Sequence, residues 1–465
     1  MKKAFLLSAL FCSACSLAPT YHRPEMALPV RFGEGIFAKA KPADELPRGA
    51  WWKTYEDPDL DLLEGKLSEN QSLQAAISRL REAQSALAAQ RATLFPSVGV
   101  NAASQKLNNS ANRAYYFKGM PLRYSDNLLT ADVSYEADVF GRLSNLVAAS
   151  RAQAEASRSD LASLKLSLES ELAADYFSLQ ALRAQRGYLK QLVEKEEESL
   201  QFTKALFRGG AAPEADLDQA EISLQSARQQ EQDLGIQEAA LVHAIALLLG
   251  KPASGFVVNT GNAVPEPRIF SAIPSTLLER RPDIASAERQ VEAANYQIGV
   301  AKAAFFPQFN FSAAGGYESG QMGNLIAAPS ELWALGASAA VIVFDAGLRN
   351  SLEEQAKARY QETVANYRQT VLNAFREVED SLSSSHQLEL EYAAQNNAVI
   401  SAQKALEQAQ FRYKGGMSPV QDLVSAQIQL LQNRSQFSAL QGRRMTASVL
   451  LVKALGGSPE QGGIR

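Results

Sequence analysis

Two long stretches of the sequence contain almost none of the residues that break helices. Between Arg142 and Phe207 the one glycine is Gly187, and between Leu348 and Lys414 there is no glycine. Neither stretch contains a proline. Each has about 66 residues and can form a single helix of roughly 100 Å at a rise of 1.5 Å per residue. A compact globular domain has no room for such helices, so an elongated, mainly α-helical structure is expected.

The chain consists of two copies of one pattern. Both long stretches end in a similar motif, FRGGAAP at 207–213 and YKGGMSP at 413–419, at a spacing of about 206 residues. A Phe-Pro pair at 95–96 is repeated at 306–307, at a nearly equal spacing. Two motifs repeated at almost one spacing indicate two structural repeats.

Each Gly-Gly pair is expected to end a helix and to begin the turn of an antiparallel hairpin. Glycine supplies the left-handed residue that caps many helix ends, and proline suits the first position of the helix that follows. In the second copy, Ser418 and Gln421 around Pro419 predict a capping box. The tip residues singled out by this pattern are Gly209, Gly210 and Pro213 in the first copy, and Gly415, Gly416, Ser418 and Pro419 in the second.

Between each Phe-Pro pair and the next long stretch, the pattern changes to that of β-strands. Apolar and polar residues alternate in 128–139 and 308–318, and less cleanly in 97–106 and 332–344. Such strands suit a membrane barrel with an apolar exterior and a polar interior. Four strands cannot close a barrel, and open sheet edges are not tolerated in lipid, so several copies of the chain must share one barrel.

The N-terminus has the features of a bacterial lipoprotein signal. Lys2 and Lys3 precede an apolar run that is too short to span a bilayer, and small residues then precede Cys15. Cys15 is therefore expected to be the acylated first residue of the mature chain, although Cys12 stands where the pattern usually has leucine. Plain secretion with a leftover thiol is the alternative. Ser16 follows Cys15 in place of aspartate, so the signal for retention in the inner membrane is absent.

These patterns predict a fold that is mainly α with a membrane β-barrel portion, in which each repeat contributes a strand pair and a long helical hairpin. The predicted segments are a signal peptide (1–14), a lipid-anchored N-terminal segment (15–58), a first repeat (59–255), a linker (256–274), a second repeat (275–456) and a C-terminal tail (457–465). The predicted helices are 59–94, 142–207 and 214–249 in the first repeat, and 275–306, 348–414 and 420–455 in the second.

Charge and composition argue against several other functions. The formal net charge is -4, which gives no electrostatic reason to expect nucleic-acid binding. The three histidines, His22, His243 and His386, share no metal-ligand spacing. The Gly-Gly pairs lack the Lys-Ser/Thr of a phosphate-binding loop. We therefore expect no cofactor, no metal site and no catalytic residues, and we do not expect an enzyme.

Several short motifs occur in an order and spacing that together are characteristic. They are CSLAPTYHRP at 15–24, Trp51-Trp52 with Asp57-Pro58, ERRPDI at 279–284, Phe306-Pro307 and Phe140-Gly141-Arg142, together with the two Gly-Gly tips. With these motifs the chain resembles, over nearly its whole length, the TolC-type outer-membrane factors, in the lipoprotein branch typified by OprM and NodT.

The resemblance implies a homotrimer whose twelve strands close one barrel in the outer membrane, joined to a helical tunnel in the periplasm. It implies partnership with a periplasmic adaptor protein, which would contact the tips, and with an inner-membrane transporter, commonly of the RND type. It also places Asp422 at a periplasmic gate, where three copies would form an acidic ring able to hold a cation. Two residues depart from the family pattern: Ser425 replaces a frequent aspartate, and Ile342 replaces a frequent proline before the Phe344 segment.

Two other functions fit parts of the sequence. A periplasmic adaptor lipoprotein would also have a lipid anchor and a helical hairpin, but one hairpin inside small β domains and not two duplicated ones. A passive porin would share the barrel but would lack helices of 100 Å. The sequence therefore favours an export duct that passes substrates from an inner-membrane pump across the periplasm and the outer membrane.

Overall fold

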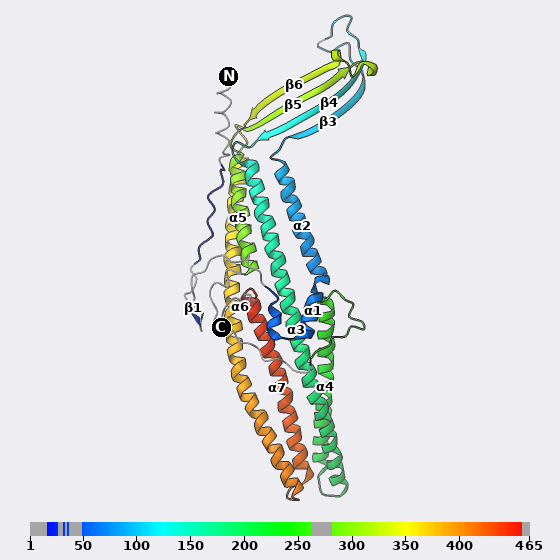
Figure 1. The fold of residues 1–465 in the computed structure, drawn as a ribbon, viewed down its shortest axis with the longest axis vertical. Helices are drawn as coiled ribbons and strands as arrows, with labels where there is room; N and C mark the ends of the chain where they lie inside the picture. The colour runs from blue at the N-terminus through cyan, green and yellow to red at the C-terminus, as the bar shows by residue number, and fades with distance from the viewer. Residues whose placement is uncertain are drawn as a thin grey trace. The chain divides into compact units, whose positions relative to one another are not determined.

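The computed structural model describes residues 16–26, 31–32, 35–36, 49–114, 116–261 and 281–457 (Figure 1). The predicted signal peptide, Cys15, most of the predicted linker and most of the C-terminal tail lie outside these residues. The α-helices are α1 (Pro58–Lys66), α2 (Gln71–Ala92), α3 (Arg142–Arg208), α4 (Glu214–Leu248), α5 (Pro282–Ala303), α6 (Leu348–Lys414) and α7 (Val420–Ala454). The strands are β1 (Arg31–Phe32), β2 (Gly35–Ile36), β3 (Ser97–Asn108), β4 (Arg123–Ala137), β5 (Gln308–Ser319) and β6 (Glu331–Ala340). Short 3-10 helices are η2 (Trp51–Tyr55), η3 (Leu67–Glu69), η5 (Met322–Asn324) and η6 (Ala328–Ser330).

The two long stretches without helix breakers form two uninterrupted helices. α3 and α6 have 67 residues each, and their bounds agree with the predicted ones to within one residue. None of the helices in the described residues is both long enough and apolar enough to cross a membrane.

The chain forms two compact units, and each unit contains parts of both sequence copies. Unit 1 comprises the described residues within Met1–Glu25, Arg79–Arg158 and Ser286–Arg368. Unit 2 comprises those within Met26–Ser78, Ser159–Ala285 and Gln369–Arg465. The copies mix because β4 of the first copy pairs with β5 of the second, and because helices of both copies pack together in unit 2.

Unit 1 contains a four-stranded antiparallel sheet in the order β3-β4-β5-β6. The register aligns Val98 with Val133, Val133 with Ala313, and Ala313 with Leu335, so one row of apolar side chains crosses all four strands. Residues at every second position share a face. The face of this row is apolar, and the opposite face carries polar residues such as Asp132, as the alternation in the sequence predicts.

The sheet differs from the prediction at two strand ends. β4 ends at Ala137 and not at 139, because the carboxylate of Asp138 accepts hydrogen bonds from the backbone N–H groups of Leu143 and Ser144 and thereby caps α3. β6 ends at Ala340 and not at 344. Ala340 pairs with Gln308, and the preceding residue on β5's side is Pro307, which has no N–H to continue the ladder.

The predicted helix 59–94 is wrong as a single helix. The chain leaves the helical conformation at Asn70, between η3 and α2, where φ is -61° and ψ is 127°. The side-chain oxygen of Asn70 accepts a hydrogen bond from the N–H of Leu73 (3.0 Å), and its amide donates to the carbonyl of Leu248 (2.8 Å). One asparagine therefore begins α2 and caps the end of α4, which joins the two short helices end to end.

A corresponding junction joins α5 to α7. The guanidinium of Arg281 donates to the carbonyl of Ala454 at the end of α7 (3.0 Å) and forms ion pairs with Asp283 and Glu377, both at 2.7 Å. α5 begins at Pro282 and ends at Ala303, shorter than the predicted 275–306; residues 275–280 lie outside the described part of the chain.

The core of unit 2 explains the aromatic motif near the N-terminus. Trp51 is 2 % exposed, and its ring nitrogen donates to the carboxylate of Glu169 (3.3 Å). Asp57 caps α1 by accepting from the N–H of Asp59 (2.9 Å), and it also accepts from the hydroxyl of Tyr176 (2.8 Å). These contacts fix the short N-terminal helices against α3.

Candidate functional site: the two hairpin tips

The first hairpin tip lies between α3 and α4. The N–H of Gly210 donates to the carbonyl of Phe207 (3.0 Å), and the N–H of Ala211 donates to the carbonyl of Leu206 (2.8 Å). Gly210 has a φ of +72°, a conformation that glycine adopts without steric cost. This pattern satisfies the last carbonyls of α3, as the Gly-Gly pair predicts.

The second tip, between α6 and α7, repeats this geometry. The N–H of Gly416 donates to the carbonyl of Tyr413 (3.0 Å), and the N–H of Met417 donates to the carbonyl of Arg412 (2.8 Å). The φ of Gly416 is +67°. The first residue of each pair, Gly209 or Gly415, still lies on the helical side of the turn, so only the second glycine needs the left-handed conformation.

The start of each returning helix differs in detail from the prediction. Pro213 and Pro419 are N-cap residues with extended ψ angles of 160° and 159°, one residue before the predicted helical position. The predicted capping box is wrong, because proline already occupies the N-cap and Ser418 stands one residue too early. The buried hydroxyl of Ser418 has no hydrogen-bond partner within the described part of the chain.

The two predicted gate residues lie on the first turns of α7. Asp422 is exposed, and its backbone N–H donates to the carbonyl of Pro419 (3.3 Å). Ser425, three residues later, is also exposed and shares a helix face with Asp422. Asp216 has the same position on α4 as Asp422 on α7, and it is exposed as well.

The structure adds apolar surface to the tips that the sequence analysis did not single out. Phe411 is 73 % exposed and Met417 is 63 % exposed, and Tyr413 and Phe207 are also exposed. Aromatic residues and methionine are enriched in protein interfaces. The signal available in the sequence was the presence of aromatic residues at the end of a helix, where an apolar side chain has little core to join.

Ion pairs connect the two helices of the first hairpin, α3 and α4. Arg186 on α3 binds Glu231 (2.8 Å) and Glu238 (2.9 Å) on α4, and Arg183 binds Glu238 at 2.8 Å. Burial raises the pKa of Glu238, but hydrogen bonds from the two arginines outweigh burial, and the net shift is downward. The carboxylate is therefore ionised at neutral pH.

The second hairpin is fastened by arginines on the returning helix. Arg444 on α7 binds Glu389 on α6 at 2.6 Å and stacks over the ring of Tyr392, 3.8 Å from its centroid. Arg443 binds Glu391 at 2.9 Å. Both hairpins therefore hold their tips on rigid helix pairs.

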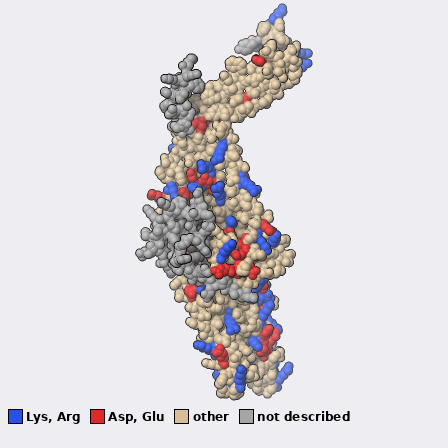
Figure 2. Space-filling view, in the orientation of Figure 1, with Lys and Arg blue, Asp and Glu red and all other residues tan. Residues whose placement is uncertain are grey.

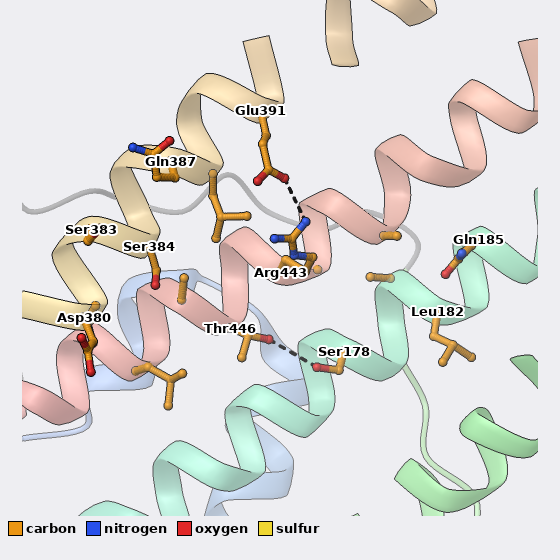
Figure 3. Close-up of a pocket in the computed structure, with 17 residues that line it drawn as sticks. Ser178, Leu182, Gln185, Asp380, Ser383, Ser384, Gln387, Glu391, Arg443 and Thr446 are labelled. Atoms are coloured by element: carbon orange, nitrogen blue, oxygen red, sulfur yellow. Dashed lines mark hydrogen bonds and ion pairs between the residues drawn. The ribbon is translucent and has the colours of Figure 1, made fainter. Parts of the chain in front are cut away.

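A pocket of about 760 Å³ lies between α3, α6 and α7 (Figure 3). Among the lining residues, the hydroxyls of Ser178 on α3 and Thr446 on α7 form a hydrogen bond (3.3 Å), and Arg443 forms an ion pair with Glu391. Gly442 allows α7 to approach α3 closely, because a Cβ there would lie 2.5 Å from the Cβ of Ala181. No pattern in the sequence predicts this pocket.

The predicted lipidation site, Cys15, lies outside the described residues, but the residues after it pack against unit 1. The hydroxyl of Ser16 donates to Asn145 at the start of α3 (2.8 Å), and the amide of Asn295 donates to the carbonyl of Pro19 (2.7 Å). The segment after Cys15 is therefore held in the same unit as the sheet.

Comparison with known proteins places both copies in one family. The family model described as "Outer membrane efflux protein" matches residues 62–251 and 273–457. The toluene efflux pump outer membrane protein TtgC of Pseudomonas putida is 29 % identical over 97 % of this chain and 94 % of its own length. The cation efflux system protein CusC of Escherichia coli is 28 % identical over 97 % of this chain and 98 % of its own length.

A solved structure shows the same fold. The outer-membrane channel CmeC of Campylobacter jejuni superimposes with a TM-score of 0.85 at 26 % identity, over 97 % of this chain and 96 % of that one. These similar proteins are outer-membrane efflux proteins and channels, so neither the periplasmic adaptor nor the passive porin considered above is supported.

Proposed function

The chain belongs to the outer membrane efflux protein family, and from that premise we propose how its parts act in export. It is an outer-membrane channel of a tripartite efflux system, the exit duct for substrates that an inner-membrane pump expels. The observation that carries this conclusion is the match of the family model to both copies, each with a strand pair and a long hairpin. Reconstitution in planar bilayers tests it, because a duct should give single-channel conductance.

The duct is proposed to be a homotrimer. The described sheet has four strands and leaves β3 and β6 as edges, whereas a closed barrel needs about eight strands or more. Three copies give twelve strands without an open edge in lipid. Native mass spectrometry in detergent should show a trimer; a persistent monomer that still inserts and conducts would contradict the shared barrel.

The N-terminal anchor is proposed to be a lipid on Cys15. The docking of Ser16 and Pro19 onto unit 1 supports an anchor close to the base of the sheet. Two or more acyl chains give stable membrane attachment. Intact-mass analysis of the mature protein should show the added diacylglycerol and acyl chain, and an unmodified N-terminus would exclude the anchor. Because the sheet also inserts, Cys15→Ala should impair targeting more than assembly.

The tips are proposed to contact a periplasmic adaptor protein. Their exposed Phe411 and Met417 offer apolar contact area next to the small Gly415 and Gly416. Gly416→Arg should abolish export at a normal yield of trimer. Gly416→Asn is the matched control, since asparagine tolerates a positive φ better than other residues and adds little bulk. If bulky residues at both Gly210 and Gly416 leave export intact, the tips are not the docking site.

Asp422 is proposed to form the periplasmic gate. In a trimer three Asp422 carboxylates converging on the axis would favour cations and hold a divalent ion. Asp422→Ala should weaken cation selectivity and divalent block in single-channel recordings, while Asp216→Ala should change neither. Ser425→Asp should strengthen both properties by adding the acid that relatives often carry. The two alanine variants could instead show equal, small effects that follow their loss of thermal stability. Asp422 would then only stabilise the N-terminus of its helix, by about 0.3–1 kcal/mol.

The exported substrate is proposed to be selected by the pump and not by the duct. Relatives named for toluene efflux and for cation efflux are 29 % and 28 % identical to this chain. Sequence similarity between ducts therefore does not indicate which substrate a duct exports. We propose an RND-type transporter as the pump. Co-expression of the duct with RND and non-RND transporters, each with its own adaptor, should restore export only with the RND pair.

A further inference from the structure

The apolar face of the sheet becomes polar toward the β3–β4 loop. Its apolar band includes Val98, Val100, Trp333 and Leu335, which are all more than 70 % exposed and suited to contact with lipid. On β5 and β6 the band ends at the row where Tyr317 pairs with Glu331. An aromatic pair such as Trp333 and Tyr317 is typical of the boundary between hydrocarbon and headgroups.

Beyond that boundary the same face is polar. Asn127 accepts a hydrogen bond from the hydroxyl of Ser104 (2.8 Å) and donates to the carbonyl of Ser319 (2.9 Å), which forms a polar row across β3, β4 and β5. The next positions on this face are Lys106, which pairs with Ser125, and Arg123, which pairs with Asn108. Both cations are exposed. They therefore project from the lipid-facing side of the sheet and not from its polar interior face.

The end of the sheet that carries these cations is strongly biased toward positive charge. Between Lys106 and Arg123 the sequence contains Arg113 and Lys118 but no aspartate or glutamate. Figure 2 shows Lys and Arg at the loop end of the sheet, a small acidic spot near them, and a mostly uncharged surface over the rest of the sheet. Glu331, on β6, is the acid on the same face. Its row in the sheet crosses β3 at Ala102, four residues before Lys106.

Neither cation is neutralised within the part of the chain that the structure describes. The Nε atom of Arg123 donates to the side-chain oxygen of Asn108 (3.1 Å), which holds the guanidinium across the β3–β4 pair. Among the described residues, Lys106 and Arg123 form no ion pair. Because α2 and α3 continue from the other end of these strands, the β3–β4 loop is the end that faces away from the periplasmic helices.

We propose that Lys106 and Arg123 bind the phosphate groups of phosphorylated lipids in the outer leaflet of the outer membrane. The rows of Lys106 and Arg123 lie four and six residues beyond the row of Tyr317, on the headgroup side of the aromatic boundary. Their long side chains point outward, toward the lipid. A guanidinium matches phosphate oxygens with two parallel hydrogen bonds, and a lysine adds a point charge. In a trimer the site occurs three times around the barrel. The proposal rests on the membrane position of the sheet in the channel described above.

Native mass spectrometry of the full-length protein in detergent tests this site with lipid A as the probe, in its bis-phosphorylated and dephosphorylated forms. The Lys106→Gln/Arg123→Gln variant should bind bis-phosphorylated lipid A about 25-fold more weakly than the wild type, or about fivefold per cation. The wild type should show a comparable loss with the dephosphorylated lipid. The Lys190→Gln/Lys404→Gln variant removes the same charge from exposed helix positions and should bind as the wild type does.

Two results would overturn the proposal. One is equal binding of both forms of lipid A by the wild type. The other is an equal loss in the two double variants, which would mean that total charge and not this site attracts the lipid. A failure of trimer assembly would appear in the same spectra as free monomer, so a fault in the proposed architecture is distinguishable from a fault in the lipid site.

Discussion

Replacing Glu64 with methionine should stabilise the protein at neutral pH, by an amount that grows as the pH rises. Glu64 lies on α1, is 5 % exposed, and neither of its carboxylate oxygens has a hydrogen-bond partner within the described residues. Burial raises the pKa of Glu64 to about 9, the nearby carboxylates of Glu169 and Asp61 raise it further, and Lys165 opposes them. The folded protein therefore carries Glu64 protonated at pH 7.

The cost of this protonation follows from the two pKa values. The unfolded chain ionises Glu64 near its ordinary value of 4.5. Holding the proton at pH 7 costs the folded state about 3.4 kcal/mol, at 1.36 kcal/mol for each pH unit above 4.5. Because the folded pKa is raised, the stability contributed by the carboxyl is fully present below pH 4.5 and is lost as the pH rises toward 9. Methionine does not titrate, so Glu64→Met should gain about 3 kcal/mol at pH 7.

Thermal unfolding in detergent at pH 5, 7 and 8.5 measures the effect as the difference in Tm between variant and wild type. The difference should be small at pH 5 and should increase at each higher pH. Glu64→Gln should lose the pH dependence as well but gain less, because it keeps unpaired polar atoms in the core. Glu82→Met, at an exposed position of α2, is the control and should show no pH-dependent gain. A gain from Glu64→Met that is equal at all three pH values would refute the reasoning, since packing alone would then explain it.

Four further substitutions test the packing described above by the same measurement. Arg281→Met should lower the free energy of unfolding by about 1–2 kcal/mol, because it leaves the carbonyl of Ala454 at the helix end without its donor and the partly exposed Glu377 carboxylate without its ion pair. An unchanged Tm would mean that the α5–α7 junction contributes nothing. Gly250→Ala should lower the free energy of unfolding by about 2 kcal/mol or more, since the φ of Gly250 is +66° and the added Cβ would lie 2.6 Å from a backbone oxygen. Gly187→Ala is the control: it lies at an open helical position, and alanine there should raise the free energy of unfolding by up to about 1 kcal/mol. Ser418→Ala should leave the Tm unchanged, because the Ser418 hydroxyl does not cap α7. A loss of about 1 kcal/mol in the free energy of unfolding would mean that Ser418 does form the predicted capping box.

The parts of the fold that depend on local sequence were predictable. The bounds of α3 and α6 follow from the absence of proline and the near absence of glycine, and their ends follow from Gly210 and Gly416, the residues that can adopt a positive φ. The faces of the sheet follow from alternation, which is a property of neighbouring residues. In each case the deciding interaction lies within a few residues of the chain.

The parts that depend on contacts distant in sequence were not predictable. Asn70 interrupts a helical pattern because the end of α4 needs a donor for Leu248, 178 residues away. β6 stops where its partner strand begins after Pro307, which no pattern within 332–344 reveals. The pocket of about 760 Å³ requires α3, α6 and α7 to lie together, and the burial of Glu64 requires α1 to pack on α3. The roles of Asp422, Ser425 and Cys15 stay predictions.

Duplication of the sequence creates a difficulty that the ion pairs resolve. Helices α3 and α6 are equivalent, and so are α4 and α7, so each outgoing helix has two returning helices of similar shape with which it could pair. Arg183 on α3 binds Glu238 on α4 at 2.8 Å, and at the equivalent positions of the second copy Glu389 on α6 binds Arg444 on α7 at 2.6 Å. The two pairs thus occupy the same place in the two hairpins with their charges exchanged.

The exchange of charges between the two ion pairs favours α3 with α4 and α6 with α7 over the other two combinations. α3 also packs on α7, where Gly442 meets Ala181, but it does so with another face. If the face of α3 that carries Arg183 packed on α7 in the same register, Arg183 would face Arg444. If α6 packed on α4 in that way, Glu389 would face Glu238. Like charges brought together in a partly buried interface cost more than a favourable surface pair contributes, so discrimination comes mainly from the repulsion in the wrong pair. The stacking of Arg444 on Tyr392 has no equivalent in the first copy, where Arg186 occupies the matching position. The copies therefore kept the same backbone geometry, which the tunnel wall needs, while their side chains diverged in charge, so that each hairpin favours its own returning helix.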